Sequence, residues 1–93
     1  MEHHEASGTF EIINALGLHA RAAARLAHVA ESYTAEVEIE KDGERVDAKS
    51  IMGLLLLCGQ RGTSLRVIAR GPDAREAVHA IGALIASRFG EDQ

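Results

Sequence analysis

Residues 35–40 of the chain read Ala-Glu-Val-Glu-Ile-Glu, and this stretch decides the fold. Apolar and acidic residues alternate along it with the two-residue period of a β-strand. One side of the strand carries the apolar side chains and the other side carries the acids, which are Glu36, Glu38 and Glu40. Such a strand belongs to a sheet with one buried face and one face in water.

The neighbouring segments supply the other strands of that sheet. Asp42-Gly43 is a typical hairpin turn, which predicts a partner strand over Glu44–Ala48. Ser64–Arg70 alternates in the same way as residues 35–40. Thr9–Asn14 is a short run rich in β-branched and apolar residues, which predicts a fourth strand.

Three segments with helical spacing lie between and after these strands. They are His19–Ser32, Ile51–Cys58 and the stretch that follows Asp73 and stops at Gly90. Ser50 is placed to cap the second helix and Gly59 to end it, while Asp73 and Glu76 resemble a capping box for the third. In the second helix we expect the core stripe to be Leu54, Leu57 and Cys58.

The predicted order is therefore β-α-β-β-α-β-α. A sheet with one wet face needs cover on the other, and the helices must supply it. We predict an α+β open-faced β-sandwich: a four-stranded antiparallel sheet covered on one face by three helices. The whole chain, 1–93, should form one domain, with residues 1–7 as a flexible polar tail.

The composition excludes several classes of function. The net charge is −4, which argues against nucleic-acid binding. The sequence contains no run of 18 apolar residues, so it predicts no membrane-spanning helix. Cys58 is the one cysteine, so no internal disulfide can form, and we expect a buried, inert thiol in a cytoplasmic protein. His3 and His4 offer too few convergent ligands for zinc, so we expect no metal and no cofactor.

Gly17-Leu18-His19-Ala20-Arg21 is the segment that carries chemistry. A turn delivers a histidine to a helix start, where N–H groups lack intrahelical partners and the dipole is positive. A phosphate there would meet the backbone N–H groups of Ala20 and Arg21 and the forked Arg21 side chain. A neutral imidazole can attack phosphorus and later release the phosphoryl group. The alternative interpretation is that His19 only caps the helix.

The same segment, extended to Gly17–Ala23, resembles the active-site signature of the HPr family, usually written GLHARPA. Ala48–Gly53 is similar to the family's regulatory serine segment, and the Asp42-Gly43 and Gly62-Thr63 turns are similar as well. The resemblance extends over most of the chain, from Thr9 to Phe89.

By this resemblance the protein is a histidine-containing phosphocarrier of the phosphoenolpyruvate-dependent phosphotransferase system, and not itself an enzyme. Members of the family accept a phosphoryl group from enzyme I and pass it to sugar-specific IIA proteins. The resemblance assigns acceptance to Nδ1 of His19 and assistance in binding and transfer to Arg21. It also names HPr kinase/phosphorylase and a transcriptional regulator as further candidate partners, and we expect a monomer.

A second candidate site surrounds Ser50. By the resemblance, Ser50 is the serine that the kinase modifies, and Ile51, Met52 and Leu55 form an exposed apolar patch that contacts partners. The alternative is that Ser50 is a plain helix cap and the apolar residues fill the core. Arg25 would add to a positive rim beside the phosphorylated histidine, unless it is only a solvated charge.

Ala22 departs from the family pattern, which has proline there. Proline would fix the first turn, whereas alanine is an excellent helix former, so the helix should survive. The departure bears on the transfer rate and on the choice of partner, and leaves open a regulatory relative that acts mainly by binding proteins. Another alternative is a small-molecule-sensing α+β module, which would leave the turn before His19 without a use.

Overall fold

The structure is a computed structural model that describes residues 4–93. Strands and helices follow one another in the predicted order, and their bounds are β1 (Glu5–Glu11), α1 (Ala20–Glu31), β2 (Glu36–Lys41), β3 (Glu44–Asp47), α2 (Ile51–Leu56), β4 (Ser64–Arg70), α3 (Ala74–Ala86) and the short 3-10 turn η1 (Arg88–Gly90).

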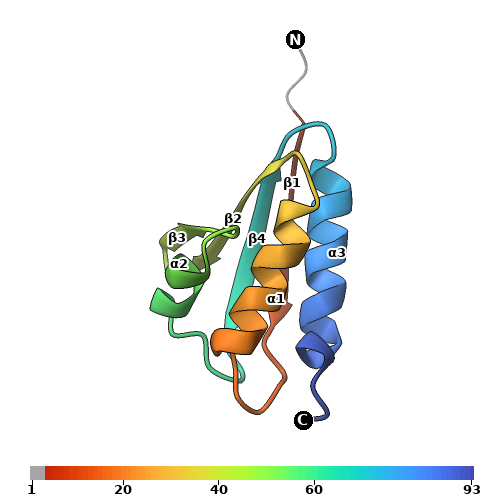
Figure 1. Cartoon of the computed structure of the whole chain (residues 1–93). Coiled ribbons are helices and arrows are strands. Elements are labelled where there is room, and N and C mark those ends of the chain that lie inside the picture. The colour runs from red at the N-terminus through yellow and green to blue at the C-terminus, as the bar shows by residue number, and fades with distance from the viewer. Residues whose placement is uncertain (1–3) are drawn as a thin grey trace.

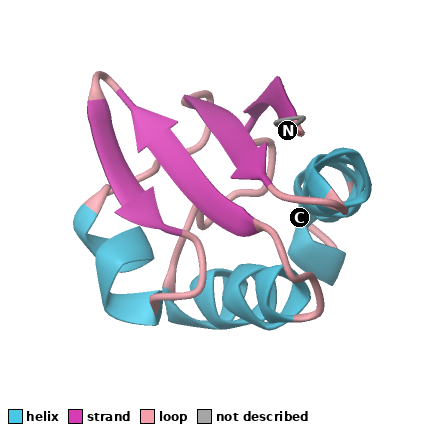
Figure 2. Ribbon diagram, turned by 90° about the horizontal axis from the view of Figure 1, so that it is seen from above, coloured by secondary structure: helices cyan, strands magenta, loops and turns pink. Residues whose placement is uncertain are grey.

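The four strands form one antiparallel sheet in the order β1-β4-β2-β3. The three α-helices all lie against the same face of this sheet (Figure 2). α1 and α3 lie side by side, and α2 packs next to β3 and α1 (Figure 1). The predicted α+β open-faced sandwich is therefore confirmed.

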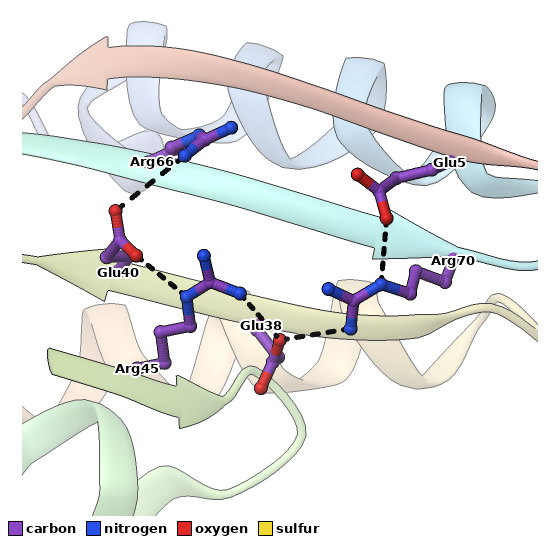
Figure 3. Close-up of polar contacts among 6 residues, drawn as sticks. All are labelled: Glu5, Glu38, Glu40, Arg45, Arg66 and Arg70. Atoms are coloured by element: carbon purple, nitrogen blue, oxygen red, sulfur yellow. Dashed lines mark hydrogen bonds and ion pairs between the residues drawn. The ribbon is translucent and has the colours of Figure 1, made fainter. Parts of the chain in front are cut away.

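The alternation along β2 divides the sheet into a dry and a wet face, as predicted. Val37 and Ile39 are buried beneath the helices. On the opposite face, acids and arginines of neighbouring strands form ion pairs, with Arg45 Nε 2.7 Å from Glu40 Oε2 (Figure 3). The connected charges are Glu5, Arg70, Glu38, Arg45, Glu40 and Arg66. Each exposed ion pair of this kind adds little to the free energy of unfolding. This face of the sheet is therefore a solvated surface and not a second core.

The dry face is covered by small and aliphatic side chains. Four of the five buried residues of α1 are alanines, with Leu26 as the fifth, which allows the helix to lie close to its neighbours. α3 also packs closely on β1: a Cβ on Gly82 would lie 2.4 Å from the ring of Phe10. Close packing of this kind leaves no space for larger side chains at these positions.

β1 begins at Glu5, earlier than the predicted strand over Thr9–Asn14. The segment Glu5–Ser7, which we had assigned to the flexible tail, pairs with the end of β4, and Glu5 lies opposite Arg70. β4 is seven residues long, so its far end offers backbone groups for this pairing. The sequence did not predict the extension because Gly8 is a weak strand former.

The end of α2 differs from the prediction. Leu54 and Leu57 are buried as expected, but Cys58 is exposed, and its φ of 53° places it in the left-handed region. The left-handed residue takes the thiol out of the core stripe, so the expectation of a buried thiol is wrong. Gly59 does not supply the left-handed turn; its small size matters instead, because a Cβ there would lie 2.8 Å from Cδ1 of Ile12.

The expected capping box at α3 is also wrong, because the side chain of Asp73 makes no cap hydrogen bond. Its two carboxylate oxygens accept hydrogen bonds of 2.8 Å from the backbone N–H groups of Thr34 and Ala35. The bond from Thr34 does most to lower the pKa of Asp73 below its usual value, although desolvation opposes it. Asp73 therefore joins the start of α3 to the loop before β2.

We predict that Asp73→Asn lowers the melting temperature at neutral pH, because an amide cannot accept both backbone bonds. A lowered pKa in the folded protein means that the stabilisation is complete above the pKa of an unfolded aspartate, about 3.9, and is lost as the pH falls through the folded pKa. The difference from wild type should therefore shrink below about pH 4. Circular dichroism melts measure it, with Asp92→Asn in the exposed C-terminal segment as control. A difference that widens in acid would contradict this assignment.

Candidate functional site

The loop between β1 and α1 is held in place by the loop between α2 and β4. The Leu18 N–H donates to the Gly59 carbonyl at 2.7 Å, and the Ile12 N–H donates to the Thr63 carbonyl at 2.8 Å. Gly17 has a φ of 67°, and a Cβ on it would lie 2.4 Å from the Gly59 carbonyl oxygen. Only glycine satisfies both conditions, so Gly17 sets the path of the chain into α1.

His19 is the N-cap residue of α1, but its side chain makes no capping hydrogen bond. Its carbonyl accepts from the Ala23 N–H at 2.8 Å, so the helical ladder begins here. The N–H groups of the first turn, including those of Ala20 and Arg21, have no acceptor within the helix. The imidazole is partly exposed beside them. His19 therefore occupies the N-cap position, as the alternative interpretation expects, but its ring makes a contact elsewhere instead of a capping hydrogen bond.

The imidazole of His19 contacts Glu91, which lies 72 residues further along the chain. Nε2 of the ring is bound to Oε2 of the carboxylate. The Asn14 side-chain amide donates to the other oxygen of Glu91 at 2.9 Å and to the Gly17 carbonyl at 2.8 Å. These contacts form what we call the Glu91 clasp, made of Asn14, Gly17, His19 and Glu91.

A sharp turn after α3 brings Glu91 to this position. Arg88, Phe89 and Gly90 all have positive φ, at 61°, 54° and 78°. Phe89 is fully buried, and Nη1 of Arg25 donates to its carbonyl. The third helix was predicted to continue to Gly90, but α3 ends at Ala86 and this turn follows it.

The Glu91 carboxylate is ionised at neutral pH. Desolvation raises its pKa, but the hydrogen bonds from Asn14 and His19 and the positive charge of Arg21 outweigh it, and the pKa lies below the usual value. An ionised carboxylate accepts hydrogen bonds and cannot donate them. Nε2 of His19 must therefore carry the hydrogen of this contact, which leaves the lone pair of a neutral ring on Nδ1.

The site opens into a shallow cleft of about 710 Å³ between the β1–α1 loop, the first turns of α1 and the C-terminal segment. His19, Arg21, Arg25 and Glu91 line it, with Leu16 at its edge. Arg21 and Arg25 are both exposed, so the structure brings two guanidinium groups to the same cleft as the histidine. The cleft combines an open imidazole nitrogen, a helix N-terminus and two cations, which suits an anionic group.

Ser50 is the N-cap of α2, and its Oγ accepts from the Gly53 N–H at 3.0 Å. Ile51 and Met52 are exposed, by 43% and 69%, while Leu55 is half-buried. Leu56, exposed by 72%, belongs to the same surface and was not predicted, because the sequence alone does not give the rotation of so short a helix. α2 packs against α1, the helix that begins after His19, so this apolar surface belongs to a neighbour of the histidine's helix.

Ala22, the position of the family proline, is fully buried in the first turn of α1. Its N–H is one of those that lack an acceptor within the helix, so proline would lose no helical hydrogen bond there. With alanine at this position, α1 still begins at Ala20, so the helix survives the departure as predicted.

Two features are absent from the described part of the chain. Within residues 4–93, no three His, Cys, Asp or Glu side chains come together in a way that could hold a metal ion, and His3 lies outside this range. None of the helices in the described part of the chain has the length and apolar character needed to cross a membrane.

Comparison with known proteins gives one consistent result. Residues 6–87 match the family model described as "PTS HPr component phosphorylation site". Phosphocarrier protein HPr of Cupriavidus necator is 48% identical over 82 residues, covering 88% of this chain and 92% of the relative. Phosphocarrier protein NPr of Shewanella violacea is 41% identical over 80 residues, covering 86% and 88%.

A solved structure agrees with the sequence relatives. The crystal structure of HPr-C-His from Thermoanaerobacter tengcongensis superposes with a TM-score of 0.91 at 41% identity, covering 95% of this chain and 99% of that one. The identity exceeds what a shared fold alone would require, and the matched region runs from β1 to α3 and includes the His19 turn. This chain therefore belongs to the HPr family, the histidine-containing phosphocarrier proteins of the phosphotransferase system.

Proposed function

We propose that His19 accepts a phosphoryl group from phosphorylated enzyme I on Nδ1 and passes it to a IIA protein. The observation that carries this proposal is the pairing of Nε2 with Glu91, since it leaves the Nδ1 lone pair available in a cleft at a helix N-terminus. In the forward step, a bond forms between Nδ1 and phosphorus while the bond from phosphorus to the donor's leaving group breaks. In the second step, a nucleophile of the IIA protein forms a bond to phosphorus while the Nδ1–P bond breaks, which returns His19 to its neutral form.

The neighbouring groups would stabilise the transferred phosphoryl group. The N–H groups of Ala20 and Arg21 and the positive end of α1 favour its negative charge. The guanidinium of Arg21 can bind two phosphoryl oxygens at once, which positions them as well as attracting them. Arg25 is already bound to the Phe89 carbonyl, so we assign it mainly to holding the C-terminal turn.

The family relationship favours this function over a small-molecule-sensing module. A regulatory relative that acts mainly by binding proteins is less well supported. Its binding surface would not need an imidazole whose Nε2 is bound to a carboxylate while Nδ1 faces the cleft. Enzyme I and IIA proteins are the partners that the family implies, and we place the carrier in the cytoplasm.

We predict that His19→Ala abolishes labelling by enzyme I and phosphoenolpyruvate. The loss follows because no other described side chain that lines the cleft offers a neutral imidazole nitrogen. Labelling is measured as acid-labile phosphate on the intact protein, and a circular dichroism melt shows whether the variant is folded. His28→Ala, an exposed histidine of the same helix, is the matched control and should label normally. Full labelling of a folded His19→Ala variant would overturn the assignment.

The second part of the proposal concerns regulation at Ser50. We propose that phosphorylation of Ser50 by a kinase weakens the docking of enzyme I and so lowers transfer through His19. A phosphate on Ser50 would lie at the start of α2, where the helix dipole favours it, so the fold should persist. The same charge, about −1.5 to −2, would lie beside the exposed side chains of Ile51 and Met52. A partner that buries this apolar surface would have to desolvate the charge.

We predict that Ser50→Asp raises the apparent KM for enzyme I and leaves the melting temperature near that of wild type, because aspartate is also a good N-cap. Ser50→Asn is the matched control, since it caps the helix without the charge and should leave KM unchanged. High salt should remove part of the Asp effect. If Asp and Asn variants have the same KM for enzyme I, and authentic phosphoserine protein does too, Ser50 is only a helix cap.

A further inference from the structure

We propose that Glu91 is a positioning residue for phosphoryl transfer: its carboxylate selects the His19 tautomer that has its lone pair on Nδ1. This inference rests on the proposed function and extends it to a residue near the C-terminal end.

The carboxylate is held at two points rather than one. Oε1 accepts from the Asn14 side-chain amide at 2.9 Å, and Oε2 is bound to Nε2 of His19. The Glu91 side chain is only 11% exposed, so water competes little for these oxygens. A carboxylate fixed at both oxygens has one orientation toward the ring.

Asn14 can have only one orientation in the Glu91 clasp. Its side chain is fully buried, and its Nδ2 donates both to Glu91 and to the Gly17 carbonyl. Rotation of the amide by half a turn would direct Oδ1 at two acceptor oxygens and break both bonds. Oδ1 itself has no hydrogen-bond partner among the described residues, so this amide orientation is chosen entirely by the two acceptors at Nδ2.

The backbone of the C-terminal turn is fixed independently of the clasp. Phe89 fills the core and its carbonyl accepts from Arg25, two residues before Glu91. The main chain therefore reaches the cleft whether or not the Glu91 side chain binds His19. A substitution of Glu91 can consequently change the hydrogen bonds to the ring without releasing the turn.

The consequence for the chemistry concerns the two nitrogens of the ring. A neutral imidazole has one N–H and one lone pair, and only the lone pair can attack phosphorus. The carboxylate requires the N–H at Nε2, as the aspartate of a serine-protease triad fixes its histidine. When the Nδ1–P bond forms, the ring becomes cationic and its Nε2–H remains bound to a negative group. Glu91 and the phosphoryl group lie on different nitrogens, so they do not compete for one position.

Glu91→Gln is the decisive variant, because the clasp dictates how the introduced amide must lie. Asn14 is a donor at this point, so the oxygen of the introduced amide has to face Asn14, and its NH₂ group then faces Nε2 of His19. Nε2 must become an acceptor, which moves the hydrogen to Nδ1 and blocks the nucleophile. A purely structural clasp predicts the opposite ranking, in which glutamine replaces glutamate better than alanine does.

The test measures the tautomer and the transfer rate in the same proteins. The ¹⁵N chemical shifts of the His19 ring, recorded on the full unphosphorylated chain, identify which nitrogen carries hydrogen. We expect the Nε2–H form in wild type and in Asp92→Asn, the Nδ1–H form in Glu91→Gln and a mixture in Glu91→Ala. The rate of labelling by enzyme I should fall about two- to tenfold in Glu91→Ala, the contribution of one hydrogen bond, and by more than about tenfold in Glu91→Gln.

Failure of this inference differs from failure of the proposed function. If wild type labels on His19 but Glu91→Gln keeps the Nε2–H form, or labels as fast as Glu91→Ala, then Glu91 is only a structural contact. If wild type does not label at all, the phosphocarrier proposal fails, whatever the tautomer measurement gives. Melting curves of the variants verify that each is folded.

Discussion

The backbone of Gly17 lies against the carbonyl of Gly59, and the remainder of the site depends on this approach. A side chain at residue 17 would place its Cβ 2.4 Å from that oxygen. The contact joins the loop before α1 to the loop after α2, and it holds His19 at the start of α1. The same approach brings the Gly17 carbonyl to Asn14, and through Asn14 to Glu91. Two small residues thus determine where the imidazole lies and what can bind it.

The fold was predictable because its signals are local in sequence. The alternation in residues 35–40 and the hairpin turn after it indicated the one-sided sheet, and the apolar stripes indicated the helices. The predicted position of His19 at a helix start was equally local, because it followed from a glycine turn and a change of period. These patterns act within a few residues, and tertiary contacts reinforced them rather than changing them.

What the sequence did not predict involves contacts between distant residues or unusual backbone conformations. Glu91 meets His19 across 72 residues, and an acid near a chain end has no local feature that separates it from a solvated one. Cys58 and Phe89 adopt left-handed conformations that are uncommon outside glycine, so neither helix end could be placed from propensity. Asp73 is a residue type typical of helix N-caps, but its carboxylate accepts hydrogen bonds from the backbone of another loop.

The two nitrogens of His19 have different environments, and the proposed chemistry depends on this difference. The most direct measurement is ³¹P–¹⁵N correlation NMR of the uniformly ¹⁵N-labelled protein after incubation with enzyme I and phosphoenolpyruvate. The account predicts that phosphorus couples to Nδ1 of His19, with hydrogen retained on Nε2. Phosphorus on Nε2, or on any residue other than His19, would contradict it.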